Sequence, residues 1–118
     1  FEGYAPLFVY IGQEGYWLNL DFRPGSQHSQ TEGTVAFLVD TLESLHQLQY
    51  QKYLLRADSG HDSVENYRAI EQFNQGSSDV HVDFIIKHNL RRESKEKWLE
   101  LAKAQGQKHT PRKGKTVY

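Results

Sequence analysis

The stretch Tyr53-Leu54-Leu55-Arg56-Ala57-Asp58-Ser59-Gly60 decides the architecture of this 118-residue chain. Its first half is mostly apolar and ends in an acidic residue, a serine and a glycine, which is typical of a short strand followed by a turn. Residues 62–76 then have helical spacing, and residues 80–87 alternate as a second strand. A strand, a helix and a strand in this order form a βαβ unit, so the two strands are predicted to be parallel.

The segment before this unit is predicted to be a hairpin followed by a helix. Residues 6–11 are apolar on both faces, which is typical of an interior strand. Residues 16–22 alternate between apolar and polar side chains after a glycine-containing turn, so they pair back on the first strand. Residues 34–48 have helical spacing, with Thr34 as the predicted N-cap.

Two further helix starts and one linker are predicted downstream. Asp62, with a glutamate three residues later, resembles a capping box. Ser94 is the predicted cap of a third helix, which would end at Gly106 and turn Trp98, Leu101 and Ala102 inward. Residues 107–115 are polar and basic and predict a linker, and residues 115–118 predict a strand truncated by the chain end. The expected fold is α/β, a mixed sheet flanked by helices.

Charge is distributed unevenly along the chain. Residues 1–85 carry 4 basic and 12 acidic residues, a net charge of −8, whereas residues 86–118 carry 10 basic and 3 acidic residues, a net charge of +7. Such asymmetry concerns partners rather than fold. The basic segment is typical either of a nucleic-acid-binding surface or of a solvated helix face with a polar tail.

Several kinds of site are excluded or disfavoured by composition. The chain has no cysteine, so disulfides, thiolate chemistry and cysteine-ligated metal sites are excluded. Its six histidines lack metal-ligand spacing. No apolar run is long enough to cross a membrane, and no signal peptide is visible. There is no methionine, so the chain is expected to be a piece of a longer protein.

Asp58 is the strongest candidate for chemistry. It follows a predicted parallel strand, and the carboxyl ends of such strands are where α/β sheets place ligands. A carboxylate there suits a hard cation such as magnesium. The alternative is an Asx-turn, in which the side chain only accepts hydrogen bonds from the backbone that follows. Arg56 lies two residues earlier on the same predicted face, where it could bind phosphate or pair with an acid.

Four motifs, taken together and in order, resemble DDE transposases of bacterial insertion sequences, of the group 1 type. Residues 55–60 resemble the family's second-aspartate motif, in which a strand ending R-x-D-S-G leads into a helix. Residues 85–91 resemble a later strand of the form I-I-K-x-N-L-R. Residues 3–7 and 23–29 resemble the family's hairpin and the turn after it. The resemblance covers about residues 3–91.

The resemblance implies a ribonuclease H-like core in which two aspartates and a glutamate hold two divalent metals, Mg²⁺ or Mn²⁺, for DNA cleavage and strand transfer. Asp58 would be the second acid, both a catalytic residue and a metal ligand. The first aspartate would lie upstream of Phe1, and the glutamate far downstream, after an inserted region. Glu93, Glu96 and Glu100 come too early, and helical charge pairing explains them. The isolated chain is therefore expected to be inactive and not to bind the metals.

On this interpretation residues 1–106 are the central part of the catalytic domain, and residues 107–118 are a basic linker and truncated strand that lead to the inserted region. The partners would be transposon-end and target DNA, with no membrane, in the bacterial cytoplasm, and a homo-oligomer is allowed. The predicted DNA-binding residues are Arg56, Lys87, Arg91, Arg92, Lys95, Arg112, Lys113 and Lys115.

Two alternatives stay open. One is a regulatory α/β module in which Asp58 accepts a phosphoryl group, although the opening hairpin is unlike a β-α repeat. The other is a nucleic-acid-binding module that uses the basic C-terminal third, with Asp58 as a turn residue.

Overall fold

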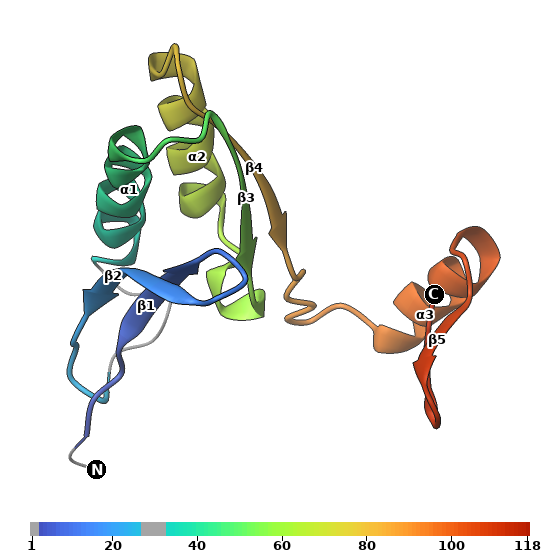
Figure 1. Cartoon of the computed structure of the whole chain (residues 1–118). Coiled ribbons are helices and arrows are strands. Elements are labelled where there is room, and N and C mark those ends of the chain that lie inside the picture. Colours follow the sequence, from blue (N-terminus) through green and yellow to red (C-terminus); the bar gives the residue numbers. More distant parts are fainter. Residues whose placement is uncertain (1–2, 27–32) are drawn as a thin grey trace. The chain divides into compact units, whose positions relative to one another are not determined.

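The computed structural model describes residues 3–26 and 33–118 (Figure 1). The chain divides into two compact units, Phe1–His88 and Asn89–Tyr118. The division falls after the second strand of the βαβ unit, whereas the sequence placed a boundary between residues 106 and 107.

The predicted βαβ unit is confirmed. Strands β3 (Lys52–Ala57) and β4 (His81–Ile86) are parallel, with Leu55 opposite Phe84, and helix α2 (Val64–Gly76) connects them. The connection suits the sequence because a parallel pair needs a crossover, which here is an amphipathic helix. The side chains of Ile70 and Phe73 on α2 are buried against the sheet.

The core lies between this pair and helix α1 (Thr34–Ser44), which packs against α2 and continues into a short 3-10 turn, η1 (Leu45–Gln47). Its buried apolar members are Leu42, Leu45, Ile70, Phe73, Val80 and Val82. Full burial of a leucine or isoleucine side chain contributes about 1.5–3 kcal/mol, so these few residues hold the helices on the sheet.

Two predicted N-caps are wrong by one residue. Gly33, with φ 95°, occupies the cap position of α1, and Thr34 is a buried residue of the helix itself. The left-handed backbone conformation favours glycine there. Ser63 caps α2, and its hydroxyl accepts a hydrogen bond from the Asn66 amide, 3.2 Å. Asp62 is instead buried and engaged elsewhere.

The predicted hairpin is present as β1 (Leu7–Ile11) and β2 (Tyr16–Asp21), which are antiparallel (Figure 1). Its alternation is broken by a register shift, since Val9 pairs with Asn19 and Tyr10 with Trp17. The shift leaves Leu18 as an extra residue on β2. Leu18 packs on the core, while the Asn19 amide donates to the Thr41 hydroxyl on α1, 2.9 Å. The bulge therefore turns two successive side chains toward α1.

The strands do not form the single mixed sheet that the sequence predicts. Within residues 3–26 and 33–118 there are three two-stranded sheets: β1 with β2, β3 with β4, and β5 with β6. Among the strands that the structure describes, β1 pairs with β2 alone, so it is not the interior strand that the sequence predicts. The coarser prediction is confirmed: an α/β protein with an antiparallel hairpin, a parallel pair and three α-helices among the described residues.

In the second unit, Ser94 caps helix α3 (Lys95–Gln105) as predicted, and its hydroxyl accepts from the Lys97 amide, 3.4 Å. Trp98 and Leu101 do not turn inward but are more than 40% exposed. The predicted linker is also wrong, because β5 (His109–Arg112) and β6 (Lys115–Val117) form a hairpin. Gly114, with φ 79°, lies in the turn between them. A glycine between two short segments is a hairpin signal, but the basic composition of residues 107–115 led to the prediction of a linker.

No α-helix in the described part of the chain is long and apolar enough to cross a membrane.

Candidate functional site

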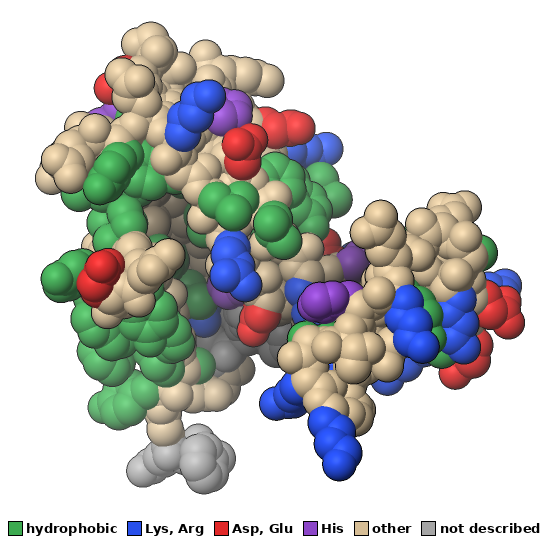
Figure 2. All heavy atoms as spheres, turned by 45° about the vertical axis from the view of Figure 1, so that its right-hand side comes forward, with side chains coloured by type: hydrophobic (Ala, Val, Ile, Leu, Met, Phe, Trp, Pro, Cys, Tyr) green, Lys and Arg blue, Asp and Glu red, His purple; other side chains and the backbone are tan. Residues whose placement is uncertain are grey.

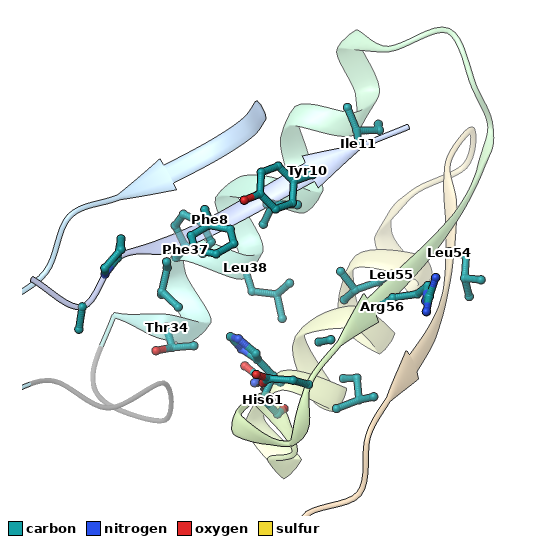
Figure 3. A pocket seen from close by; sticks show the side chains of 18 of the residues that line it. Phe8, Tyr10, Ile11, Thr34, Phe37, Leu38, Leu54, Leu55, Arg56 and His61 are labelled. Carbon is teal, nitrogen blue, oxygen red and sulfur yellow. Dashed lines mark hydrogen bonds between the residues drawn. The ribbon is translucent and has the colours of Figure 1, made fainter. Parts of the chain in front are cut away.

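A groove of about 700 Å³ lies between the hairpin and the parallel pair. One wall is β1, the other is β3 with the 3-10 turn η2 (Ser59–His61) that follows it, and the first turns of α1 contribute to its lining. Figure 3 shows Leu38, from α1, and Leu55, from β3, facing each other inside it. Its lining is mostly apolar except at the end where β3 stops.

Asp58 lies at that polar end, where the sequence places it. The residue follows β3 directly, and its Oδ1 accepts a hydrogen bond from the Gly60 amide, 2.9 Å. The His61 amide donates to the Asp58 carbonyl, 3.1 Å. The first bond is that of an Asx-turn and the second is a backbone bond of the η2 turn, so the turn-forming interpretation is confirmed. The same turn holds the carboxylate beside the groove, so Asp58 can form the turn and also contact a ligand in the groove.

His61 and Asn66 line the groove beside Asp58. Figure 3 shows His61 projecting from η2 toward the groove. Asn66 is only 2% exposed, and its Nδ2 donates to the His61 carbonyl, 2.9 Å. Its Oδ1 has no hydrogen-bond partner among the described residues. A buried acceptor without a partner is costly, so a donor supplied by a ligand or water would be favoured there.

Arg23 also lines the groove and was not singled out from the sequence. It is buried, its Nε donates to the Ala5 carbonyl, 3.2 Å, and its Nη1 donates to the Thr34 hydroxyl, 3.2 Å. Buried arginines are held by such bonds because desolvation of the guanidinium is expensive. Arg23 therefore joins the N-terminal segment to the start of α1 and shapes the groove.

Asp62, predicted as a helix cap, is a second acid near Asp58 in sequence, with a different role. It is 6% exposed, accepts a hydrogen bond from the Tyr67 hydroxyl, and its Oδ2 lies 3.0 Å from Nδ1 of His88. The contact ties the loop after β4 to the start of α2. No local sequence pattern could reveal this contact, because His88 lies 26 residues away.

The predicted phosphate-binding residues are divided between the two units. Arg56 and Lys87 belong to the first unit and are exposed. Within the described part of the chain, the ion pairs include none between Arg56 and an acid, so the predicted pairing with an acid is not seen and phosphate binding stays a prediction. The other six belong to the second unit and are all exposed: Arg91, Arg92, Lys95, Arg112, Lys113 and Lys115.

The second unit is strongly basic. It carries nine Lys and Arg against three Glu, a net charge of +6. Figure 2 shows Lys and Arg side chains spread over it. Two of the three acids make local hydrogen bonds: Glu93 accepts from the Trp98 indole, 2.7 Å, and Glu96 from the Ser94 hydroxyl, 2.8 Å. The bond from Ser94 lowers the pKa of Glu96 below its usual value. Both acids thus have helix-capping or packing roles.

Residues 3–26 and 33–118 contain no group of three or more His, Cys, Asp or Glu side chains that could hold a metal ion. Comparisons of the chain with protein-family models, with curated proteins and with solved structures found no match. The features of the described residues that bear on function are the groove, the Asp58 turn and the basic second unit.

Proposed function

We propose that this chain is the central part of the ribonuclease H-like catalytic domain of a DNA transposase, with Asp58 as one of three metal-binding acids. The observation that carries the proposal is the position of Asp58, at the carboxyl end of a parallel strand and at the rim of a groove. Ligands of open α/β sheets bind at this end of the strands. The order of the motifs in residues 3–91 supports the same assignment.

The described residues alone do not fit a two-metal site. Among residues 3–26 and 33–118, Asp58 is the one carboxylate that lines the groove, and Asp62 is buried and bonded to Tyr67 and His88. A pair of divalent cations needs several oxygen ligands at once, and one carboxylate cannot position both. We therefore assign no catalytic step to these residues. Asp58 would contribute a ligand to a site whose other acids come from elsewhere.

DNA would be held chiefly by the second unit. Its net charge of +6 and its exposed basic side chains favour phosphate contacts through counterion release. The first unit carries −7 and would contact DNA only where cations are displayed, as at Arg56 and Lys87. This feature also supports the second candidate function, a nucleic-acid-binding module without catalysis.

One experiment separates these two functions. In a complete protein that contains this chain, Asp58→Asn should lower metal-dependent strand transfer by more than about a thousandfold, as loss of a catalytic group does. DNA binding should be retained. The amide keeps an acceptor for the Gly60 bond, so the turn is preserved. Asp83→Asn, a change at an exposed acid of β4, is the matched control and should be without effect.

The 118-residue chain by itself, mixed with supercoiled plasmid and Mn²⁺, should not nick DNA, because Asp58 is the single carboxylate that the described residues bring to the groove. Metal-dependent nicking that Asp58→Asn removes would show that the chain is a complete enzyme and would contradict the proposal. Full strand transfer by the Asp58→Asn variant of the complete protein would leave only the binding function.

A further inference from the structure

The second unit has no buried core. None of residues 89–118 is buried, and the four that are partly buried are Asn89, Leu90, Ser94 and Ala102. The chain has no cysteine, and the described residues contain no group of three or more His, Asp or Glu side chains that could hold a metal ion. Below about 40 residues, a folded unit usually needs a disulfide, a metal ion or a partner, because it buries too little surface to offset its conformational entropy. The second unit therefore has little stability of its own.

The β5–β6 hairpin of this unit, red in Figure 1, is weakly held by its own backbone. Its strands have four and three residues, and a hairpin of that size is at best marginally stable in water. Pro111 lies inside β5, where it has no amide hydrogen to donate, and the register shifts between His109 and Arg112. The strands are thus aligned at two pairs, His109 with Val117 and Arg112 with Lys115.

The pair next to the turn brings two positive charges together. Arg112 lies opposite Lys115, and Lys113 in the turn is a third cation. Like charges directly opposite each other on antiparallel strands destabilise the pairing. The sequence has no Asp or Glu after Glu100, so the hairpin contains no acid that could neutralise them. Within the described part of the chain, the ion pairs include none of these three cations.

The backbone of the turn, by contrast, suits a hairpin. Gly114 has φ 79°, a left-handed conformation that glycine adopts without strain and that short hairpin turns require. The turn therefore favours pairing of β5 with β6, whereas the charges of Arg112 and Lys115 oppose it. An anion held between these two side chains would remove the repulsion and leave the preference of the turn in place.

We propose, on the basis of the DNA-binding role proposed above for the second unit, that the tip of the β5–β6 hairpin is a phosphate clamp whose pairing is completed by DNA. Arg112 and Lys115 bind one phosphate group of the backbone from opposite strands, and Lys113 binds a neighbouring phosphate. Formation of the hairpin is coupled to binding, because the anion replaces the repulsion within the pair by two attractive contacts. In solution the paired form is the minor one until DNA is present.

The partner is a polyanion rather than a single phosphate ion because of the charge of the whole unit. It carries nine Lys and Arg and a net charge of +6, and its three cations on α3 are exposed, at Lys95, Lys97 and Lys103. A polyanion releases condensed counterions at each contact with a cation, which a small anion does not. The affinity for phosphate groups linked in a DNA backbone is therefore much higher than the affinity for the free ion.

The test follows amide hydrogen exchange of β5 and β6 by NMR in the 118-residue chain, with and without a short DNA duplex. If only the paired form binds, DNA at about a hundred times its dissociation constant slows exchange by up to about a hundredfold. Inorganic phosphate, at the same concentration of phosphate groups and the same ionic strength, should have no effect. Strands β3 and β4 of the acidic unit are the internal control and should exchange as before.

Two variants separate the charge pair from the net charge. Lys115→Glu places an acid opposite Arg112, so it should slow exchange in the DNA-free hairpin by about fivefold. It should also reduce the further slowing by DNA, because a carboxylate then occupies the place of the phosphate. Lys113→Glu is the matched control, since it changes the net charge equally but lies in the turn, outside the aligned pairs. It should weaken DNA binding without slowing exchange in the DNA-free hairpin.

Each contrary result has a distinct meaning. Unchanged exchange in β5 and β6, while fluorescence anisotropy shows that DNA is bound, would overturn the coupling and leave the DNA-binding role in place. No binding of DNA would overturn both. Equal slowing by inorganic phosphate would assign the tip to free phosphate ions instead of DNA. Equal slowing in the two DNA-free variants would show that net charge, and not the pair of Arg112 and Lys115, controls the hairpin. The transposase assignment is tested separately, by Asp58→Asn.

Discussion

Asp79 illustrates how a single exposed residue is coupled to pH. His46 Nδ1 lies 3.2 Å from Asp79 Oδ1, and the hydrogen bond from His46 is the main cause that lowers the pKa of Asp79 below its usual value. A carboxyl group with a lowered pKa in the folded state stabilises that state only while it is ionised. The contribution is therefore complete above the usual aspartate pKa and is lost as pH falls through the lowered value.

We predict that His46→Phe raises the pKa of Asp79 toward its usual value. Phenylalanine keeps a ring beside Phe73, 5.3 Å away in the present structure, but cannot donate a hydrogen bond. Carbon-detected NMR titration of the side-chain carboxyl group measures the shift. His81→Phe is the control, because His81 faces Asp83 instead. An unchanged Asp79 titration in His46→Phe would contradict the assignment of the cause.

At the scale of elements, the parallel pair depends on a side chain that acts as an edge partner. Asn74 pairs with both backbone groups of Val82, a residue that is 2% exposed. If the Asn74 side chain were removed, water could therefore not readily replace its two bonds to Val82. The predicted hairpin and helices follow from the periodicity of each segment. The two bonds between Asn74 and Val82 instead join α2 to a strand residue eight positions further along the chain.

We predict that Asn74→Ala destabilises the chain by about 2–6 kcal/mol, because two buried backbone groups lose their partners at about 1–3 kcal/mol each. Urea unfolding, followed by circular dichroism, measures the change. Gln75→Ala, at the exposed neighbouring position on α2, should change the stability by less than about 0.5 kcal/mol. Equal effects of the two substitutions would show that the bonds between Asn74 and Val82 do not stabilise the fold.

At the scale of the whole molecule, the charge asymmetry coincides with the division into units. The first unit carries −7 and contains the groove, and the second carries +6. Electrostatic attraction of a polyanion should therefore depend on the second unit. Because phosphate contacts release counterions, salt dependence measures how many are made.

We predict that affinity for duplex DNA falls steeply with salt. Replacing Arg112, Lys113 and Lys115 with glutamine should reduce the slope of log affinity against log salt concentration by up to about 3. Lys52→Gln, at an exposed position of β3 in the acidic unit, should leave the slope unchanged. If the triple variant has the same slope as the unchanged chain, the β5–β6 hairpin is not part of the DNA-binding surface. Fluorescence anisotropy at several salt concentrations measures each slope.

The local pattern of the sequence determined the elements and part of the site. The helical spacing of residues 62–76 between two apolar runs required a crossover, and so predicted a parallel pair. Serine before a helical segment predicts a cap, because a cap needs only a contact within one turn. The structure shows that contact between the Ser94 hydroxyl and the amide three residues ahead. Asp58 was placed at a strand end for the same local reason.

Only the tertiary structure decided how the elements meet. The β2 bulge, which turns Leu18 and Asn19 toward α1, follows from packing against a helix more than ten residues away. The burial of Asp62 by Tyr67 and His88, and the opening between β1 and β3, likewise arise from contacts between distant segments. Periodicity records which face of an element is apolar, whereas partners across space are set by the sum of many contacts.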